Sequence, residues 1–323
     1  MTIRAVVKGV GHYLPERVVP NSEFEKTLET TDEWIRSRSG IERRHFAAEG
    51  EYTSDLAEIA ARRALEDANM DADQVDAIVL ATSTPDLTFP SSATMVQSKL
   101  GMTRGFAFDI QAVCAGFVYA LSNANALIAS GQAKTILVIG AETFSHILDF
   151  EDRSTCVLFG DGAGALVIQA EEGIGSSADR GILATDLHSD GRYKDILYVD
   201  GGVSTQSTGH LRMAGKEVFR HAVEKLTSTS ESALSKAGLQ NEDIDWIVPH
   251  QANIRIIQGT SKKLGMPNEK VVATVQDHGN TSAASIPLAM SVGKANGQIK
   301  EGDVVVACAI GGGLAWGAVA LRW

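Results

Sequence analysis

The sequence predicts an α/β fold made of two similar halves, because three pairs of segments recur along the chain in the same order. The pairs are ALEDANMDADQVDAIVLATST with ALSKAGLQNEDIDWIVPHQAN (64–84 and 233–253), KLGM with KLGM (99–102 and 263–266), and GQAKTILVIGA with GQIKEGDVVVACA (131–141 and 297–309). In the longest pair, a helical pattern leads through a polar loop into a short apolar strand. Two such halves predict stacked layers of helix and sheet. The polar stretch Glu171–Arg180 is the expected boundary, which divides the chain into residues 1–175 and 176–323.

The elements of each half follow from the residue pattern. Asn21–Gly40 predicts a helical insertion and Asp86–Pro90 predicts a loop. The segment AFDI (107–110) predicts a strand, and apolar spacing from Phe117 to Ile128 predicts a helix that the next glycine ends. Further strands are apolar enough to be buried on both faces, and we expect them at Ala77–Ala81, TILVIG (135–140), ALVIQ (165–169), Trp246–Pro249 and VVVACAI (304–310).

The composition argues against several classes of function. The 323 residues are 44% hydrophobic and carry a net charge of −11, which disfavours general nucleic-acid binding. The uncharged stretches Ile110–Ala133 and Val304–Leu321 contain polar residues or a triple glycine, so we expect no membrane span. The three cysteines, Cys114, Cys156 and Cys308, form no CxxC pair. They predict neither a disulfide framework nor a metal site, and they suit the reducing cytoplasm.

Cys114 is the cysteine that the pattern marks for chemistry. It stands at a predicted strand-to-helix turn, and its small neighbours Ala112, Ala115 and Gly116 would let a substrate reach the sulfur. Unpaired N–H groups at a helix N-terminus favour the thiolate. The alternative is a structural role, which is the commoner one for a lone cysteine among apolar residues. Cys156 and Cys308 lie inside the apolar runs TCVLFG and VVVACAI, which predict strands, and both are expected to be core residues.

Two polar residues of the second half could assist a nucleophile. His250 follows the WIVP strand directly, and Asn280 stands in the turn-like DHGNTSAAS before a helix. If the halves repeat, both turns lie at corresponding ends of the sheets, where α/β proteins place ligands. A cysteine, a histidine and an asparagine far apart in sequence form a known type of nucleophilic site. For any single histidine, a structural role is the more frequent one.

Two glycine-rich segments could lie near such a site. GDGAGALV (160–167) lacks the GxGxxG spacing and a Walker lysine, so we expect a turn between strands rather than a phosphate loop. Gly311-Gly312-Gly313 stands at the matching place in the second half. Its exposed backbone N–H groups could serve an oxyanion hole, because glycine permits close approach.

Together these motifs resemble a known enzyme family. Cys114 in VCAGF, His250 in PHQAN and Asn280 in HGNTSAAS, with FGDGAGA and GGGLAWG, resemble β-ketoacyl-[acyl carrier protein] synthase III of the thiolase superfamily. The resemblance runs from GVGHYLPERVVPN to Trp323. It implies a five-layered αβαβα fold of two duplicated halves, a homodimer, and no cofactor or metal. It also implies a catalytic triad of Cys114, His250 and Asn280, with an oxyanion hole formed by the backbone of Cys114 and Gly312.

The resemblance also implies substrate contacts. Trp34 and Arg153 would sandwich the CoA adenine, with Arg38 near the phosphates. The remaining contacts to substrate would come from Gly215, Phe219, Asn253, Ile310 and Phe89, the last reaching into the partner's acyl pocket. Basic residues outnumber acidic ones in Gly209–Lys263, and this surplus suits the strongly acidic acyl carrier protein. The carrier-protein patch would comprise Arg220, Gln251, Ala252, Asn253, Ile254, Arg255, Lys262 and Lys263.

The implied reaction is a decarboxylating Claisen condensation that begins fatty acid synthesis. An acyl-CoA primer, with acetyl-CoA favoured, acylates Cys114, and malonyl-acyl carrier protein then loses CO₂ and attacks to give 3-oxoacyl-acyl carrier protein. Ile310, where some members have phenylalanine, bears on the primer. One alternative is a related Cys-His-Asn condensing enzyme of secondary metabolism with another starter or acceptor. A second is a non-catalytic acyl-CoA-binding protein in which Cys114 is structural.

Overall fold

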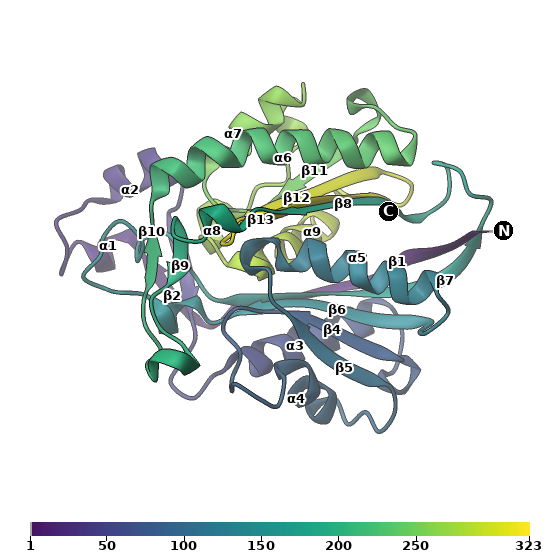
Figure 1. The fold of residues 1–323 in the computed structure, drawn as a ribbon, viewed down its shortest axis with the longest axis horizontal. Helices are drawn as coiled ribbons and strands as arrows, with labels where there is room; N and C mark the ends of the chain where they lie inside the picture. Colours follow the sequence, from purple (N-terminus) through teal and green to yellow (C-terminus); the bar gives the residue numbers. More distant parts are fainter. Residues whose placement is uncertain (1) are drawn as a thin grey trace.

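The computed structural model describes residues 2–323 and consists of five stacked layers (Figure 1). Two sheets form the second and fourth layers, and helices cover both outer faces and fill the space between the sheets. The first sheet contains β1 (Thr2–Tyr13), β4 (Ala77–Ala81), β5 (Phe106–Ile110), β6 (Thr135–Glu142) and β7 (Gly162–Gly173). The second contains β8 (Gly181–Ser189), β11 (Trp246–Pro249), β12 (Val304–Gly311) and β13 (Ala315–Arg322). The predicted αβαβα architecture is therefore confirmed.

The two sheets confirm the predicted duplication. The first sheet has the order β1-β7-β6-β4-β5 and the second has β8-β13-β12-β11. In both, the first two pairings are antiparallel and the third is parallel. In the first sheet, β5 pairs in parallel with the outer side of β4. In the second sheet, only one parallel bridge, between Ile247 of β11 and Val271, stands in the place of that pairing. Because the orders correspond, β4 matches β11 and β6 matches β12.

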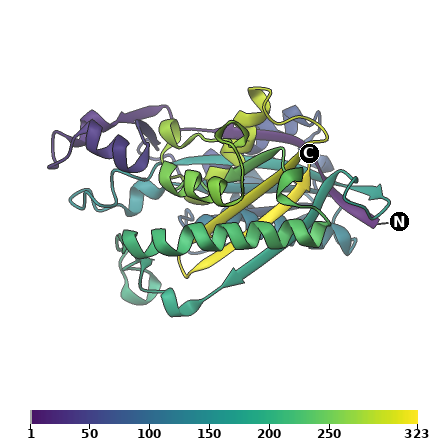
Figure 2. The same cartoon turned by 90° about the horizontal axis from the view of Figure 1, so that it is seen from above.

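The helices occupy the three helical layers (Figures 1 and 2). Helices α3 (Thr53–Asp67) and α4 (Ser92–Lys99) cover the outer face of the first sheet, and α6 (Gly215–Ala237) and α7 (Ile254–Lys263) cover that of the second. Between the sheets lie α5 (Gly116–Ala129) and α9 (Ser285–Ala295). Helices α1 (Asn21–Phe24), α2 (Asp32–Ser39) and α8 (Val275–His278) lie at one end, with the hairpins β2 (Arg17–Pro20)–β3 (Arg43–Phe46) and β9 (Leu197–Val199)–β10 (Leu211–Met213). The described helices include none that is long and apolar enough to cross a bilayer.

The core is built as the residue pattern predicts. Every residue of β4, β6 and β12 is buried, as expected for strands covered by helices on both faces. The central helix α5 begins one residue before its predicted start, and Gly131 follows its end with a φ of 73°. The insertion at 21–40 forms α1 and α2, and residues 86–90 form a loop.

Three local expectations need correction. Residues 162–164, expected in a turn, begin β7 ahead of the strand predicted at 165–169, because glycine lets this strand approach α9: a Cβ on Gly164 would lie 2.6 Å from the backbone nitrogen of Leu288. Cys156 is fully buried but lies in a turn rather than a strand. The first three residues of the expected boundary, 171–173, complete β7. The division into residues 1–175 and 176–323 stays a prediction.

Candidate active site

Cys114 lies at the amino end of a buried helix, as its sequence context predicts. Strand β5 ends at Ile110, the 3₁₀ turn η2 (Val113–Ala115) follows, and α5 begins at Gly116. Val113 has a φ of 49°, an unfavourable value for a β-branched residue. Backbone strain of this kind is common beside reactive groups. The turn therefore places the nucleophile at the junction of strand and helix.

Burial opposes the thiolate that the helix N-terminus favours. Burial raises the pKa of the Cys114 thiol to about 12, the nearby Ser282 hydroxyl lowers it, and the charge of Glu142 raises it further. Burial also raises the pKa of Glu142 to about 7, against the hydrogen bonds that this carboxylate accepts. The Thr84 hydroxyl and the Ser83 backbone N–H donate to it at 2.7 and 3.0 Å. The resting cysteine is therefore a thiol, and its proton must leave before sulfur attacks.

His250 is a neutral imidazole at the end of β11. It is 2% exposed, and burial lowers its pKa to about 3. Its Nδ1 lies 2.7 Å from the Ser285 hydroxyl, which also accepts a hydrogen bond from the Gln251 backbone N–H at 3.3 Å. Ser285 is the first residue of α9. The strand end and the helix start together fix the plane of the ring.

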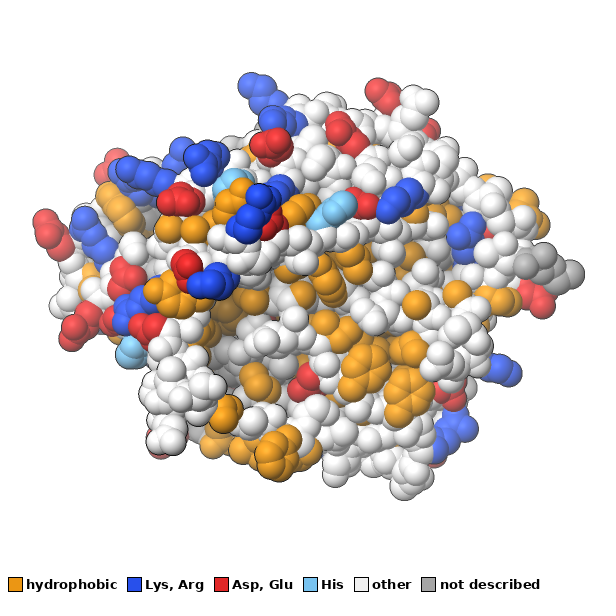
Figure 3. Space-filling model, viewed as in Figure 1, with side chains coloured by type: hydrophobic (Ala, Val, Ile, Leu, Met, Phe, Trp, Pro, Cys, Tyr) orange, Lys and Arg blue, Asp and Glu red, His pale blue; other side chains and the backbone are white. Residues whose placement is uncertain are grey.

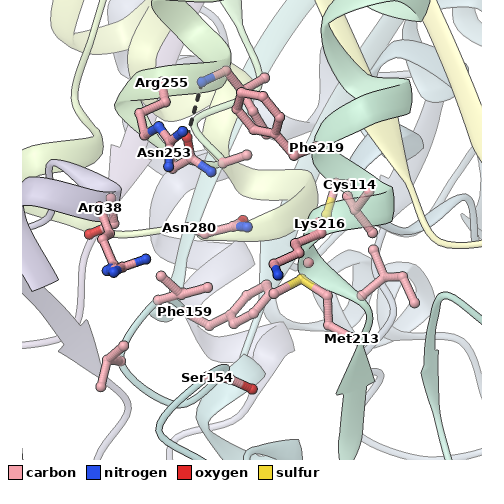
Figure 4. Close-up of a pocket in the computed structure, with 18 of the residues that line it drawn as sticks. Arg38, Cys114, Ser154, Phe159, Met213, Lys216, Phe219, Asn253, Arg255 and Asn280 are labelled. Atoms are coloured by element: carbon pink, nitrogen blue, oxygen red, sulfur yellow. Dashed lines mark hydrogen bonds between the residues drawn. The ribbon is translucent and has the colours of Figure 1, made fainter. Parts of the chain in front are cut away.

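Asn280 is oriented by its own loop. The backbone N–H of Ser282 donates to Asn280 Oδ1 at 2.9 Å, and the Asn280 side chain projects into the cavity that Cys114 also lines (Figure 4). Ser282 has a φ of 48°, so strain flanks this residue as it flanks Cys114. Because Oδ1 is occupied, the amide group of Asn280 remains available as a hydrogen-bond donor.

The triple-glycine segment lies against the nucleophile. A Cβ on Gly311 would stand 2.6 Å from the Cys114 backbone nitrogen, and one on Gly312 would stand 2.7 Å from the Leu197 carbonyl oxygen. No side chain fits at either position. The backbone of this turn therefore approaches Cys114 as an oxyanion hole requires.

One cavity of about 480 Å³ brings most of the predicted site residues together. Its lining includes Cys114, His250, Asn280, Trp34, Arg38, Gly215, Phe219, Ala252, Asn253, Arg255 and Ile310. These residues come from α2, η2, α6, α7, β12 and the loops beside them, and Figure 4 shows Arg38, Cys114, Phe219, Asn253, Arg255 and Asn280 around the cavity. Asn253 also caps α7, because its Oδ1 accepts the Ile256 N–H at 3.0 Å.

Arg153 does not line this cavity but packs on Trp34. The Arg38 and Arg153 guanidinium carbons lie 5.0 and 5.4 Å from the centre of the Trp34 ring, and Arg153 donates a hydrogen bond to the Glu29 carbonyl. A planar base between Arg153 and Trp34 needs about 7 Å, which is two van der Waals contacts. Arg153 must therefore move outward for the predicted adenine sandwich to form.

The residues predicted to meet a carrier protein divide into surface and interior groups. Arg220, Arg255, Lys262 and Lys263 are exposed, and basic side chains gather over α6 and α7 in Figure 3. Gln251 is an exception, because it is 1% exposed. Its amide donates to the Pro249 carbonyl at 2.7 Å and accepts the Thr274 N–H at 2.8 Å. The expectation for Gln251 is therefore corrected: its side chain holds the loop after His250 and cannot reach a partner. Ala252 and Ile254 are half-buried.

Phe89 lies outside the cavity, at the tip of the 86–90 loop. It is 82% exposed, and Leu87 beside it is 53% exposed. Sequence reasoning missed other cavity residues, among them Ser154, Leu197, Met213 and Lys216. Leu197 and Met213 come from the β9–β10 hairpin, an insertion whose glycine-rich sequence could have indicated a loop excursion. Among residues 2–323, no group of three His, Cys, Asp or Glu side chains is placed to hold a metal.

Two family models match this chain. Residues 108–191 match the model described as 3-oxoacyl-[acyl-carrier-protein (ACP)] synthase III, and residues 234–323 match the model of its C-terminal part. Among curated proteins, the chain is 79% identical to the beta-ketoacyl-[acyl-carrier-protein] synthase III of Ruegeria pomeroyi over the full length of both. It is 70% identical to the protein of that name from Rhodobacter capsulatus, again over the full length of both.

Solved structures give the same result. The 3-oxoacyl-[acyl-carrier-protein] synthase III of Aquifex aeolicus VF5 is 45% identical with a TM-score of 0.93, covering 99% of this chain and 100% of that one. The priming β-ketosynthase of the R1128 polyketide pathway is 34% identical with a TM-score of 0.93, covering 100% of this chain and 97% of that one.

Proposed function

The chain belongs to the 3-oxoacyl-[acyl-carrier-protein] synthase III family, the acyltransferases that initiate fatty acid synthesis, and we propose that Cys114, His250 and Asn280 perform its condensation, with acetyl-CoA as the favoured primer. The reaction joins an acyl-CoA primer to malonyl-acyl carrier protein and releases CO₂ and CoA. The observation that carries the residue assignment is the single cavity lined by these three side chains.

Acylation of Cys114 is the first half-reaction. Its sulfur attacks the thioester carbonyl, forming the new C–S bond, and the bond to the CoA sulfur breaks. The Cys114 thiol gives up its proton to solvent as the sulfur attacks, and the departing CoA sulfur takes up a proton, while His250 donates a hydrogen bond to the cysteine sulfur. Ser285 donates its hydroxyl proton to Nδ1 of His250 and so leaves the ring proton on Nε2. Backbone N–H groups of Cys114 and Gly312 stabilise the tetrahedral oxyanion.

Condensation is the second half-reaction. The malonyl group loses CO₂, and the electron pair of the broken C–C bond forms an enolate whose oxygen accepts hydrogen bonds from His250 and Asn280. The enolate carbon attacks the acyl-cysteine carbonyl, and the Cys114 sulfur leaves and recovers a proton. Neutral donors suit this step because a carboxylate in the place of Asn280 would repel the developing charge. The chemistry proposed for these residues uses no cofactor.

Substrates and partners are assigned by the same proposal. Trp34, Arg38 and Arg153 bind the nucleotide end of CoA, and Gly215, Phe219 and Asn253 line the pantetheine channel. Arg220, Arg255, Lys262 and Lys263 present positive charge to the acidic carrier protein, with Ala252, Asn253 and Ile254 beside them. Two copies form a cytoplasmic homodimer in which Phe89, too exposed to serve its own subunit, enters the partner's acyl pocket beside Ile310.

A second candidate is a condensing enzyme of secondary metabolism with another starter or acceptor. The likeness to the R1128 priming β-ketosynthase favours this candidate. The fold of the chain matches that protein with the same TM-score, 0.93, as it matches the Aquifex protein. The acceptor separates the two candidates. Turnover with malonyl-acyl carrier protein supports the first, and faster turnover with a CoA-linked acceptor supports the second.

The test is intact-protein mass spectrometry after mixing with a panel of acyl-CoAs. We expect a mass gain on Cys114 that malonyl-acyl carrier protein discharges, and the primer that loads fastest identifies the substrate. Cys114→Ala should take up no acyl group, and Asn280→Ala should acylate but discharge about a hundredfold more slowly. Cys308→Ala, which changes a cysteine away from the cavity, is the matched control. Acylation of Cys114→Ala would disprove the assignment of the nucleophile.

A further inference from the structure

Arg44 is a buried cation that the proposed reaction does not use. It lies in β3, its exposed fraction is 0%, and among residues 2–323 it forms no ion pair. Its guanidinium donates to the carbonyl oxygens of Val19 at 3.0 Å and Val157 at 2.6 Å, and it lies 5.0 Å from the centre of the Phe24 ring. Its Nε has no hydrogen-bond partner. Two carbonyl oxygens and one aromatic face are its direct contacts, and the charges of Asp32 and Glu23 act on it without forming an ion pair.

Such an arrangement is a poor way to stabilise a core. A buried charge without a carboxylate partner keeps much of its desolvation cost, and apolar side chains of similar volume are often the more stable choice. Burial lowers the pKa of Arg44 to about 10, so the group is still charged at neutral pH. This desolvation cost indicates that Arg44 positions another part of the protein. Its two hydrogen bonds, to Val19 and Val157, show which segments it holds.

The segment that Arg44 holds leads directly to Asn280. Val157 is followed by Leu158, whose carbonyl accepts the Asn280 backbone N–H at 2.8 Å. The Asn280 carbonyl in turn accepts the Gly160 N–H at 3.0 Å, and a bridge joins Asn280 to Phe159. The backbone of residues 157–160 thus forms hydrogen bonds with both the N–H and the carbonyl of Asn280. Arg44 in turn forms a hydrogen bond with the carbonyl of Val157 in that backbone.

The stem of Arg44 makes a second contact with the same unit. A Cβ on Gly160 would lie 2.9 Å from the Cβ of Arg44, and one on Gly279 would lie 3.1 Å from it. The Arg44 stem therefore packs against both Gly160 and Gly279, which lie beside the hydrogen bonds to Asn280. Val157, Phe159 and Asn280 all line the cavity, whereas Arg44 does not. Any effect of Arg44 on the reaction must pass through these residues.

We propose that Arg44 is the positioning residue for Asn280, holding the 157–160 segment against β2 so that the Asn280 amide meets the enolate oxygen. This inference rests on the role proposed above for Asn280. Arginine suits the task because its planar fork reaches two carbonyls at once, whereas lysine carries a single ammonium. The expected consequence is selective: decarboxylation needs the position of Asn280, whereas acylation needs Cys114 and His250.

The test is a double-mutant cycle between Arg44 and Asn280, read on the two half-reactions. The variants are Arg44→Met, Asn280→Ala and the combination, with Arg44→Lys as a second replacement that keeps the charge. Acylation is measured as the mass gain from acetyl-CoA, and decarboxylation as CO₂ released from malonyl-acyl carrier protein. We expect Arg44→Met to lower decarboxylation roughly tenfold in the natural chain and to have little further effect in Asn280→Ala, because residues linked by one hydrogen-bond network couple. Arg44→Lys should lie between the natural chain and Arg44→Met.

A purely structural Arg44 would give a different pattern. The loss would then be the same in both backgrounds, or acylation would fall as much as decarboxylation, and either result overturns the proposal. If Arg44→Met does not fold, the cycle is completed with Arg44→Lys. Arg17→Met removes an exposed arginine from the neighbouring strand β2 and is the control. If Asn280→Ala alone retains full decarboxylation, the proposed function of Asn280 fails, and this outcome is separate from a failure of Arg44.

Discussion

Cys114 is surrounded by groups that oppose its ionisation. Burial has the largest effect on its pKa, and Glu142 adds a like charge. Glu142 is itself fully buried and accepts hydrogen bonds from the hydroxyls of Thr82 and Thr84. At neutral pH this carboxyl stands near its own titration point, with a pKa of about 7. Its charge therefore changes in the range in which the enzyme would work.

Replacing Glu142 by glutamine should lower the pKa of Cys114. Glutamine keeps a carbonyl to accept the threonine hydroxyl groups but removes the charge that disfavours the thiolate. The measurement is the rate of alkylation by iodoacetamide as a function of pH, which follows the thiolate. We expect the profile to move to lower pH, while the exposed replacement Glu49→Gln leaves it in place. An unchanged or upward-shifted profile for Glu142→Gln contradicts this account.

The sequence predicted the site residues that stand in recognisable motifs. It did not predict the residues that position those site residues or change their pKa. Cys114, His250 and Asn280 follow strands or turns and stand beside small residues, so their context predicts a site. Arg44 lies in β3 among other charged residues, and Glu142 ends the apolar strand β6, so the context of neither residue indicates a site. Only the fold shows that Arg44 meets Val157, which is 113 positions away. A hydrogen bond across that separation leaves no periodic signal in the sequence.

At the scale of elements, the end of β12 fixes the space left for the nucleophile. The turn after Gly311 joins β12 to β13, and η2 packs directly against it. A glycine is needed there for its lack of a side chain, because the added Cβ would overlap the Cys114 amide. Strand and helix start are therefore in contact through backbone alone.

Gly311→Ala should slow acylation while leaving a folded protein. The methyl group would lie 2.6 Å from the Cys114 nitrogen, so η2 must shift and the oxyanion hole must open. We expect the rate of acyl-enzyme formation to fall roughly tenfold or more. The free energy of unfolding should decrease by about 1–3 kcal/mol. Gly191→Ala is the control, since nothing lies within 4 Å of its added Cβ. Equal acylation of the two variants, by mass spectrometry, would contradict the close approach.

Elements were predictable where apolar residues run without a break. The pattern placed β4 and β11 at their observed bounds. It failed at residues 162–164, where glycines lie in a strand because α9 packs closely on it, and at residues 155–158, where an apolar run forms a turn. In both places a contact from a distant element decides the conformation, and composition alone predicts the wrong one.

At the scale of the whole molecule, buried histidines should make stability depend on pH. Burial lowers the pKa of His278 to about 4, and its Nδ1 has no hydrogen-bond partner. Between pH 6.5, the ordinary value, and about 4, the unfolded chain binds a proton at this residue and the folded chain does not. Stability must therefore fall as the pH falls through this range. His250 acts in the same direction down to about pH 3, and Glu142 acts in the opposite direction between about pH 4.5 and 7.

His278→Gln should therefore gain stability relative to the natural chain as the pH is lowered. From pH 7 to pH 5 we expect the difference in the free energy of unfolding to move by about 1–2 kcal/mol in favour of the variant. Urea unfolding at a fixed protein concentration measures it. The exposed His210→Gln is the control. A difference that stays constant between the two pH values would show that His278 does not remain neutral in the folded protein.

The internal repeat made the overall architecture predictable. Matching segments implied matching strand orders, and the sheets bear this out, with only the parallel partner β5 lacking a full counterpart. The insertions that shape the cavity, such as the β9–β10 hairpin, lie outside the repeated segments, so the repeat does not predict them. Duplication therefore predicts the frame of the molecule, and the insertions that make the two halves differ complete the site.

The pairing of β1 with β7 sets a timetable for synthesis on the ribosome. Thr2 pairs with Gly173 and Tyr13 with Ala163, so the first strand to be made has its only partner in this sheet far along the chain. At about 5–20 residues per second, roughly ten to thirty seconds pass between the two. During that interval the nascent segment has an unpaired edge and apolar side chains such as Val6 and Val10. An unpaired edge of this kind can pair with the wrong strand, so the chain is open to misassembly until β7 has been made.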